Sequence, residues 1–161
     1  MRLVIADTGP IHYLILIGHT DLLPRLFERV LLPSIVRDEL SHPLAPASVQ
    51  RWITVVPAWL EIAESPAVAL SAGIHKGEAA SIALASALHA DLLLMDDRKG
   101  VIAAEQRGLN VTGTLGVLDL AAERRLIDFA QVAAALELTT FRMPLALLDE
   151  LLARHKGSGK P

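Results

Sequence analysis

Short, uninterrupted apolar runs alternate with longer Ala- and Leu-rich segments along this chain of 161 residues. Strands that are apolar at every position, rather than at every second one, are typical of parallel sheets buried on both faces. We expect strands at residues 2–6, 29–32, 53–56, 92–95 and 109–111. Because helices separate them, the pattern predicts an α/β fold with a central, mostly parallel sheet flanked by helices.

The expected helices lie at residues 10–17, 21–27, 34–40, 78–90, 99–107, 114–123, 128–136 and 144–155, with a helical turn at 48–51. Ser34 and Thr114 are expected to be N-caps, and Gly108 a C-cap. Residues 58–74 show a mixed pattern that leaves room for one or two helices. The length fits a single domain over residues 1–155. We expect residues 156–161 to form a disordered tail.

Acidic residues stand at the edges of four of these elements. Asp7 follows the first strand, and Asp96 and Asp97 follow the fourth. Glu39 lies late in an early helix, whereas Glu78 lies in the first turn of the Ala-rich helix. Ligand sites of open α/β sheets lie beyond the carboxyl ends of the strands, so these acids are expected to meet in one crevice. Like charges there raise one another's pKa, and Mg²⁺ or Mn²⁺ would suit such hard oxygen ligands.

A divalent cation in such a crevice would activate water and neutralise charge on a phosphoryl group, which suits hydrolysis of a phosphodiester. Each acid also has an ordinary explanation when it is taken singly. Asp7 would be a turn former, and Glu39 a solvated helix residue. Glu78 would interact with the helix dipole, and Asp96 would cap the next helix. The shared site is the expectation that explains all of them together.

Composition excludes several classes of site. The chain has no cysteine, which rules out disulfides, thiol catalysis and thiolate zinc sites. Its net charge of −3 gives no overall basic surface, so nucleic acid would have to bind through a local patch or through metal-bridged phosphates. No apolar run approaches the roughly 20 residues that span a bilayer, and no signal-peptide pattern opens the chain. We therefore expect a cytoplasmic protein without a membrane partner. The histidines show no ligand spacing: His12, His19, His42, His75, His89 and His155.

Two other enzyme classes share part of the first motif. The triplet Asp7-Thr8-Gly9 is also the signature of retroviral-type aspartic proteases, but their fold is all-β and this chain is dominated by helical segments. Phosphotransferases of the aspartyl-phosphate type also place an Asp after the first strand. They usually need a second acid two residues later, where this chain has Gly9.

Four segments in order resemble the PIN domain superfamily. They are Asp-Thr-Gly-Pro from Asp7, the helix that carries Glu39, Gly-Glu-Ala-Ala-Ser-Ile-Ala from Gly77, and Leu-Leu-Met-Asp-Asp-Arg from Leu93. The segment Asn-Val-Thr-Gly-Thr-Leu-Gly-Val from Asn110 fits the branch related to VapC-type toxins. The resemblance covers roughly residues 2–150, and its four motifs occur in the order that the family shows.

The resemblance implies a Mg²⁺- or Mn²⁺-dependent endoribonuclease, the toxin of a type II toxin–antitoxin system. Such proteins are usually homodimers that a small cognate antitoxin protein silences. By this resemblance Asp7, Glu39, Glu78 and Asp97 would be the catalytic metal ligands, with Asp96 as an adjacent ligand. The chain departs from the pattern at Glu78, where Asp is common, and at Met95, where many relatives have a hydroxyl residue.

Further candidates would contact the RNA substrate. They are Thr8, Arg98, Lys99, Thr112 and Thr114, although turn chemistry and ordinary surface charge explain the same residues equally well. The alternative function is a catalytically weak or inactive PIN-like module that binds nucleic acid or protein. Hydrophobic residues make up 52% of the chain, and the Leu- and Ala-rich helices would then serve either an interface or the core.

Overall fold

The structure is a computed structural model that describes residues 2–67 and 73–156. Within them, five strands form one parallel sheet in the order β3-β2-β1-β4-β5, with β1 in the centre. The strands are β1 Leu3–Ala6, β2 Arg29–Pro33, β3 Leu60–Ala63, β4 Leu92–Leu94 and β5 Val111–Thr112. The predicted single-domain α/β fold is therefore confirmed. The parallel arrangement brings the carboxyl ends of all these strands to one edge of the sheet.

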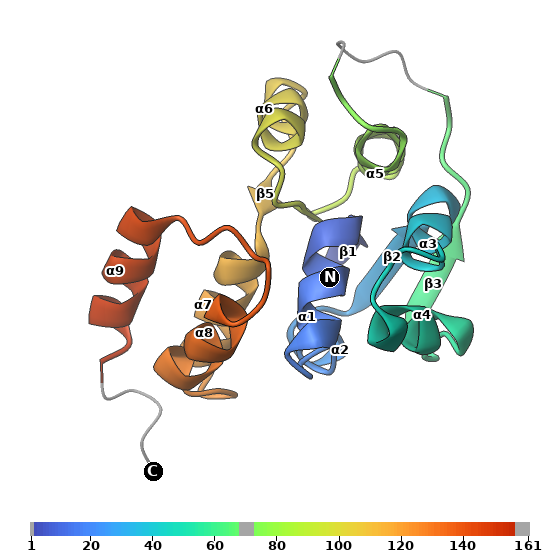
Figure 1. Cartoon of the computed structure of the whole chain (residues 1–161). Helices are drawn as coiled ribbons and strands as arrows, with labels where there is room; N and C mark the ends of the chain where they lie inside the picture. Colours follow the sequence, from blue (N-terminus) through green and yellow to red (C-terminus); the bar gives the residue numbers. More distant parts are fainter. Residues whose placement is uncertain (1, 68–72, 157–161) are drawn as a thin grey trace.

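Helices cover both faces of the sheet (Figure 1). They are α1 Thr8–Leu16, α2 Leu22–Leu26, α3 Ser34–Leu40, α4 Ala47–Thr54, α5 Lys76–Ala87, α6 Arg98–Gln106, α7 Thr114–Glu123, α8 Phe129–Glu137 and α9 Leu145–Arg154. Alternate strand residues supply two hydrophobic clusters, as the two-residue period of a strand requires. Val4 and Leu94 belong to the larger cluster, whereas Ile5 and Leu93 belong to the smaller one with Ile82 of α5.

The third strand lies later in the chain than the sequence predicts. Residues 53–56 do not form a strand, because Ile53 belongs to α4 and the helical turn expected at 48–51 extends over Ala47–Thr54. Val49 and Ile53 are four residues apart and both buried, so packing of one helix face overrides the β-propensity of these side chains. Within 58–74, Leu60–Ala63 is β3 and no described residue is helical. Part of this range, 68–72, lies outside the described residues.

Two expected caps are wrong. Pro33 and Gly113 occupy the N-cap positions of α3 and α7, so Ser34 and Thr114 are the first helical residues. Thr114 instead bonds a carboxylate from another loop, as described below. Gly108 ends α6 as expected, since it follows the C-cap residue with φ of +77°, a conformation that favours glycine. Of the tail predicted at residues 156–161, residues 157–161 lie outside the described residues. Lys156 forms part of a turn after α9.

The last helix is held to α7 by charged side chains. Asp119 of α7 lies 2.9 Å from the Arg154 guanidinium and 2.6 Å from Nε2 of His155. The ring of His155 also lies beside Phe129 of α8, with 5.2 Å between the ring centroids. These contacts stabilise the packing of α9 on the larger hydrophobic cluster.

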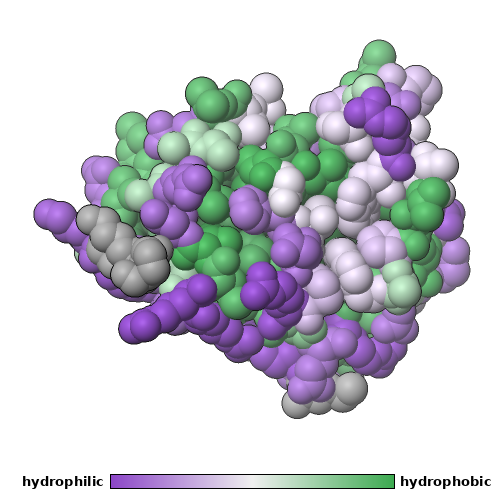
Figure 2. All heavy atoms as spheres, turned by 90° about the horizontal axis from the view of Figure 1, so that it is seen from below, coloured by the Kyte–Doolittle hydropathy of each residue, from purple (hydrophilic) through white to green (hydrophobic). Residues whose placement is uncertain are grey.

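Some large hydrophobic side chains remain exposed on the described part of the surface. On the side that Figure 2 shows, hydrophobic patches are interrupted by hydrophilic residues. Large exposed apolar side chains come from separate parts of the chain: Leu44, Val55, Leu138 and Leu145. No helix within the described residues has the length and apolar character needed to cross a membrane.

Candidate active site

Asp7 is a buried carboxyl group at the carboxyl end of the central strand. It lies between β1 and α1, and its backbone N–H donates to the carbonyl of Leu94 at 2.9 Å, which ties the ends of β1 and β4 together. Its side chain is only 5% exposed, and Ser81 Oγ donates to its Oδ1 at 3.0 Å. Burial is the main cause that raises the pKa of Asp7 to about 7; the charges of Glu39 and Asp96 act in the same direction, and hydrogen bonds from the Thr8 backbone and from Ser81 act against it.

Glu39 reaches this end of the sheet from α3. Thr8, the residue after Asp7, donates its hydroxyl to Glu39 Oε2 at 2.8 Å. The Glu39 carboxylate also packs against the start of α5 at Gly77, where an added Cβ would lie 2.7 Å from Glu39 Cδ. Glycine at this position therefore leaves space for the carboxylate between α3 and α5.

Glu78 lies one residue beyond this contact, in the first turn of α5. Its Oε1 accepts a hydrogen bond from the backbone N–H of His75 at 3.3 Å, but its buried Oε2 accepts none. The side chain is 6% exposed. Burial is the main cause that raises the pKa of Glu78 to about 7; a hydrogen bond with the Asp97 carboxylate and the charges of Asp97 and Asp7 act in the same direction. A buried carboxyl oxygen that accepts no hydrogen bond is costly, which makes Glu78 the most exceptional group of the site.

Asp96 and Asp97 are adjacent but differ in environment. Asp96 is largely buried and accepts two hydrogen bonds from Thr114, from the amide at 2.7 Å and from the hydroxyl at 2.6 Å. Burial still raises the pKa of Asp96. Asp97 is exposed and caps α6 by accepting from the Gly100 amide at 3.1 Å, a bond that lowers its pKa. The cap expected at Asp96 is therefore made by Asp97.

The acids act on one another as a single electrostatic group. Asp7 is influenced by Glu39 and Asp96, and Glu78 is influenced by Asp97 and Asp7. However, no three His, Asp or Glu side chains in the described part of the chain are arranged so that they could hold a metal ion. The donor set nevertheless fits a hard divalent cation, because it consists of carboxylate oxygens and includes the unpartnered Oε2 of Glu78. Binding would require some carboxylates to turn toward one another.

The expected substrate contacts differ in their surroundings. Thr8 and Thr114 already donate their hydroxyls to Glu39 and Asp96. Thr112 turns its methyl group toward Gly116. Arg98 and Lys99 are exposed in the first turn of α6, and the Lys99 side chain extends toward Gly73.

Several residues of the site did not stand out in the sequence. Ser81 follows Gly77 by one helical turn and points to the same interior, but a serine in an Ala-rich helix is an ordinary residue. Gly77, Gly100 and Gly113 provide close approach for Glu39, Glu78 and Asp96 respectively. Gly113 is 17 residues from Asp96 and Gly77 is 38 residues from Glu39 in the chain, so no local pattern in the sequence indicated these contacts.

Comparison with protein families identifies the family of the chain. The family model DUF3368, described as a PIN domain, matches residues 3–157. The chain belongs to the PIN domain family. The predicted membership of the PIN domain superfamily is therefore confirmed, and PIN domains are generally nucleases.

Solved structures agree on the fold of this PIN domain. It is similar to a PilT N-terminus domain protein from the hyperthermophilic archaeon Sulfolobus solfataricus P2, with a TM-score of 0.50 and 14% sequence identity. That match covers 89% of this chain and 100% of the archaeal chain. At this identity the similarity concerns the fold alone. No curated protein gives a significant match.

Proposed function

We propose that this PIN domain is a Mg²⁺- or Mn²⁺-dependent endoribonuclease. The observation that carries the proposal is the pair of buried carboxyl groups, Asp7 (5% exposed) and Glu78 (6% exposed), at the carboxyl edge of the sheet, where burial and neighbouring acids raise the pKa of both to about 7. A protein gains nothing in stability from placing such groups together, so a cationic ligand is the best explanation of the cluster. Asp7, Glu39, Glu78 and Asp97 would hold the cation, with Asp96 beside them.

The other residues of the crevice would orient these carboxylates. Ser81 donates a hydrogen bond to Asp7, and the Thr8 hydroxyl donates one to Glu39. Each bond would hold one oxygen of the carboxylate in place. The hydrogen bond from the Gly100 amide lowers the pKa of Asp97 and so favours its ionised form. When bound, the cation would activate water and offset negative charge on the phosphodiester. Arg98 and Lys99, at the exposed start of α6, would attract the RNA backbone.

The direct test is cleavage of a mixed-sequence single-stranded RNA by purified protein with Mn²⁺, with Mg²⁺ and with EDTA. Asp7→Asn preserves the size of the side chain and removes its charge. Asp149→Asn, an exposed residue of α9, makes the same chemical change away from the crevice and is the matched control. We expect metal-dependent cleavage by the wild type and by Asp149→Asn, and none by folded Asp7→Asn. Equal cleavage by all three proteins would refute the assignment of the site.

We further propose that the enzyme is the toxin of a type II toxin–antitoxin pair, a cytoplasmic homodimer silenced by a small antitoxin protein. The support is the resemblance of its motifs to VapC-type toxins, together with exposed leucines such as Leu145 of α9, which is 68% exposed. Induced expression in a bacterial host should arrest growth with the wild type and not with Asp7→Asn. Normal growth with a soluble, cleavage-competent wild type would contradict the toxin assignment.

A second candidate function is a PIN domain that binds RNA or protein without cutting it. The observation that favours it is the present arrangement of the acids, in which Asp96 and Asp97 already accept hydrogen bonds from Thr114 and Gly100. This candidate predicts retention of RNA in a gel-shift experiment, with no cleavage in either metal. Cleavage that depends on Asp7 would exclude it.

A further inference from the structure

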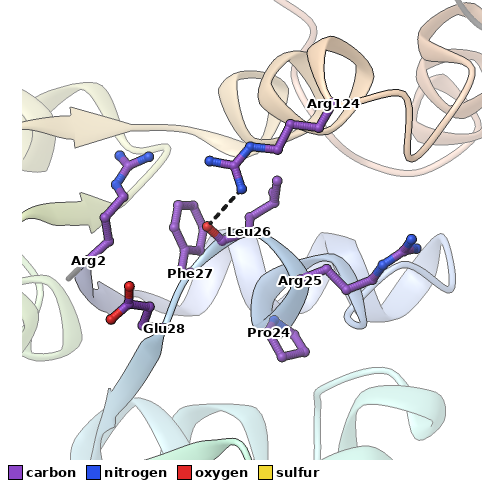
Figure 3. Close-up of a pocket in the computed structure, with 7 residues that line it drawn as sticks. All are labelled: Arg2, Pro24, Arg25, Leu26, Phe27, Glu28 and Arg124. Carbon is purple, nitrogen blue, oxygen red and sulfur yellow. Dashed lines mark hydrogen bonds between the residues drawn. The ribbon is translucent and has the colours of Figure 1, made fainter.

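A cavity of about 480 Å³ lies at the opposite end of the sheet from the acidic residues of the candidate active site. It is lined by residues 2, 24–28 and 124, so it is built where β1 and β2 begin and α7 ends (Figure 3). The acidic residues described above all lie beyond the carboxyl ends of the strands. The two regions are therefore separate, and a ligand of this cavity would not occupy the candidate active site.

Two arginines from different elements face each other across this cavity. The Arg2 guanidinium lies over the ring of Phe27, 5.2 Å from its centroid, and Arg124 donates to the carbonyl of Leu26 at 3.4 Å (Figure 3). Arg25 also lines the cavity, but its side chain extends away from the other two and lies 3.9 Å from Asp21. Both facing guanidinium groups thus have a contact that orients them.

The cavity carries an excess of positive charge. Glu28 is the one carboxylate among its lining residues, against three arginines. None of the ion pairs found in the described part of the chain uses Arg2 or Arg124. Arg2 contacts only the face of the Phe27 ring, and Arg124 makes one long hydrogen bond to Leu26. Most N–H groups of the two guanidinium groups therefore remain available to a ligand. In a protein with a net charge of −3, this local concentration of arginine is not a consequence of composition.

The chemistry of the lining selects the class of ligand. Guanidinium groups bind phosphate through paired N–H donors in a planar fork, and two of them on separate elements can contact different oxygens of one group. A volume of about 480 Å³ falls within the range of small-molecule sites and exceeds what a single phosphate ion fills. We propose that this cavity binds a phosphate group that carries a substituent, either a free phosphomonoester or a phosphodiester of the RNA backbone.

The first experiment titrates inorganic phosphate into the full chain in EDTA and follows backbone amide signals by NMR. We expect saturable shifts at Leu26 and Phe27, and about tenfold weaker binding in Arg2→Gln and in Arg124→Gln, since each removes charged hydrogen bonds. Arg25→Gln removes the same charge from the same rim and should weaken binding much less. Equal weakening by all three substitutions, or absence of saturable shifts, would overturn the proposal.

A second experiment distinguishes the two sources of phosphate. Adenosine 5′-monophosphate and a single-stranded RNA without terminal phosphates are titrated separately, in EDTA and with Asp7→Asn so that no RNA is cut. Tight binding of the mononucleotide that Arg124→Gln weakens supports a free phosphomonoester, and the same result with RNA alone supports the backbone. If neither binding depends on Arg2 and Arg124, the proposal is wrong. None of these readings requires nuclease activity, so they stand apart from the proposed function.

Discussion

Replacing Asp7 by Asn should stabilise the metal-free protein at alkaline pH but not at acidic pH. Burial and the neighbouring acids raise the Asp7 pKa from its ordinary value of 3.8 to about 7. Between these two pH values, Asp7 is therefore protonated in the folded state and ionised in the unfolded state. Stability from this group is fully present below pH 3.8, and it is lost as the pH rises to about 7.

The size of the effect follows from the width of that interval. A difference of roughly 3 pKa units corresponds to about 4 kcal/mol, at about 1.4 kcal/mol per unit, and relaxation of the crevice would reduce it. Asn does not titrate, and its side-chain oxygen can still accept the hydrogen bond from Ser81. We expect the free energy of unfolding of Asp7→Asn, relative to that of the wild type, to be larger (the variant more stable) by about 2–4 kcal/mol at pH 8 than at pH 4.

Urea denaturation in EDTA at both pH values measures this difference, with the fluorescence of Trp52 and Trp59 as the probe. Comparing the two pH values cancels any constant effect of the amide on packing. Asp149→Asn, on the exposed surface of α9, should show no comparable difference between the two conditions. A difference below about 1 kcal/mol for Asp7→Asn would mean that the crevice does not penalise the Asp7 charge, and the reasoning would be refuted.

Three further substitutions test individual contacts. Ser81→Ala removes a hydrogen bond that lowers the Asp7 pKa, so the titration midpoint of the Asp7 carboxyl carbon in NMR should move upward; an unchanged midpoint would show that the contact has no electrostatic role. Gly77→Ala puts a methyl group against the Glu39 carboxylate. It should lower the rate of RNA cleavage by about tenfold or more and change the free energy of unfolding by less than about 1 kcal/mol. Full activity would contradict the assignment of Glu39. Asp119→Asn weakens the attachment of α9 to α7 and should cost about 1–2 kcal/mol in urea denaturation; wild-type stability would show that the helix is held by apolar packing alone.

The sequence predicted the parallel sheet because strands buried on both faces leave a continuous apolar pattern. The same criterion failed for the third strand. Glu61 interrupts the apolar pattern of Leu60–Ala63, so this segment lacks the continuous apolar run of a strand buried on both faces, and β3 lies at the edge of the sheet. There Glu61 forms an ion pair of 2.9 Å with Arg29 of β2, so the charge has a partner across the strands. An edge position tolerates a charge that a central position would not.

The approach of the acids could be predicted because the carboxyl ends of parallel strands must meet at one edge. Their individual partners could not. Whether Asp96 or Asp97 caps α6 depends on side-chain rotamers, and the structure gives that role to Asp97 and joins Asp96 to Thr114. The contact of Ser81 with Asp7 joins residues 74 positions apart, and no local pattern specifies it.

The central claim is that the acids at this edge of the sheet bind one or more divalent cations. Anomalous diffraction from crystals soaked in Mn²⁺ measures this directly, because the signal locates manganese without reference to activity. We predict an anomalous peak within coordination distance of Asp7 and of at least one of Glu39, Glu78 and Asp97, and its absence in Asp7→Asn crystals treated identically. Wild-type crystals with no peak at these carboxylates under saturating Mn²⁺ would contradict the account.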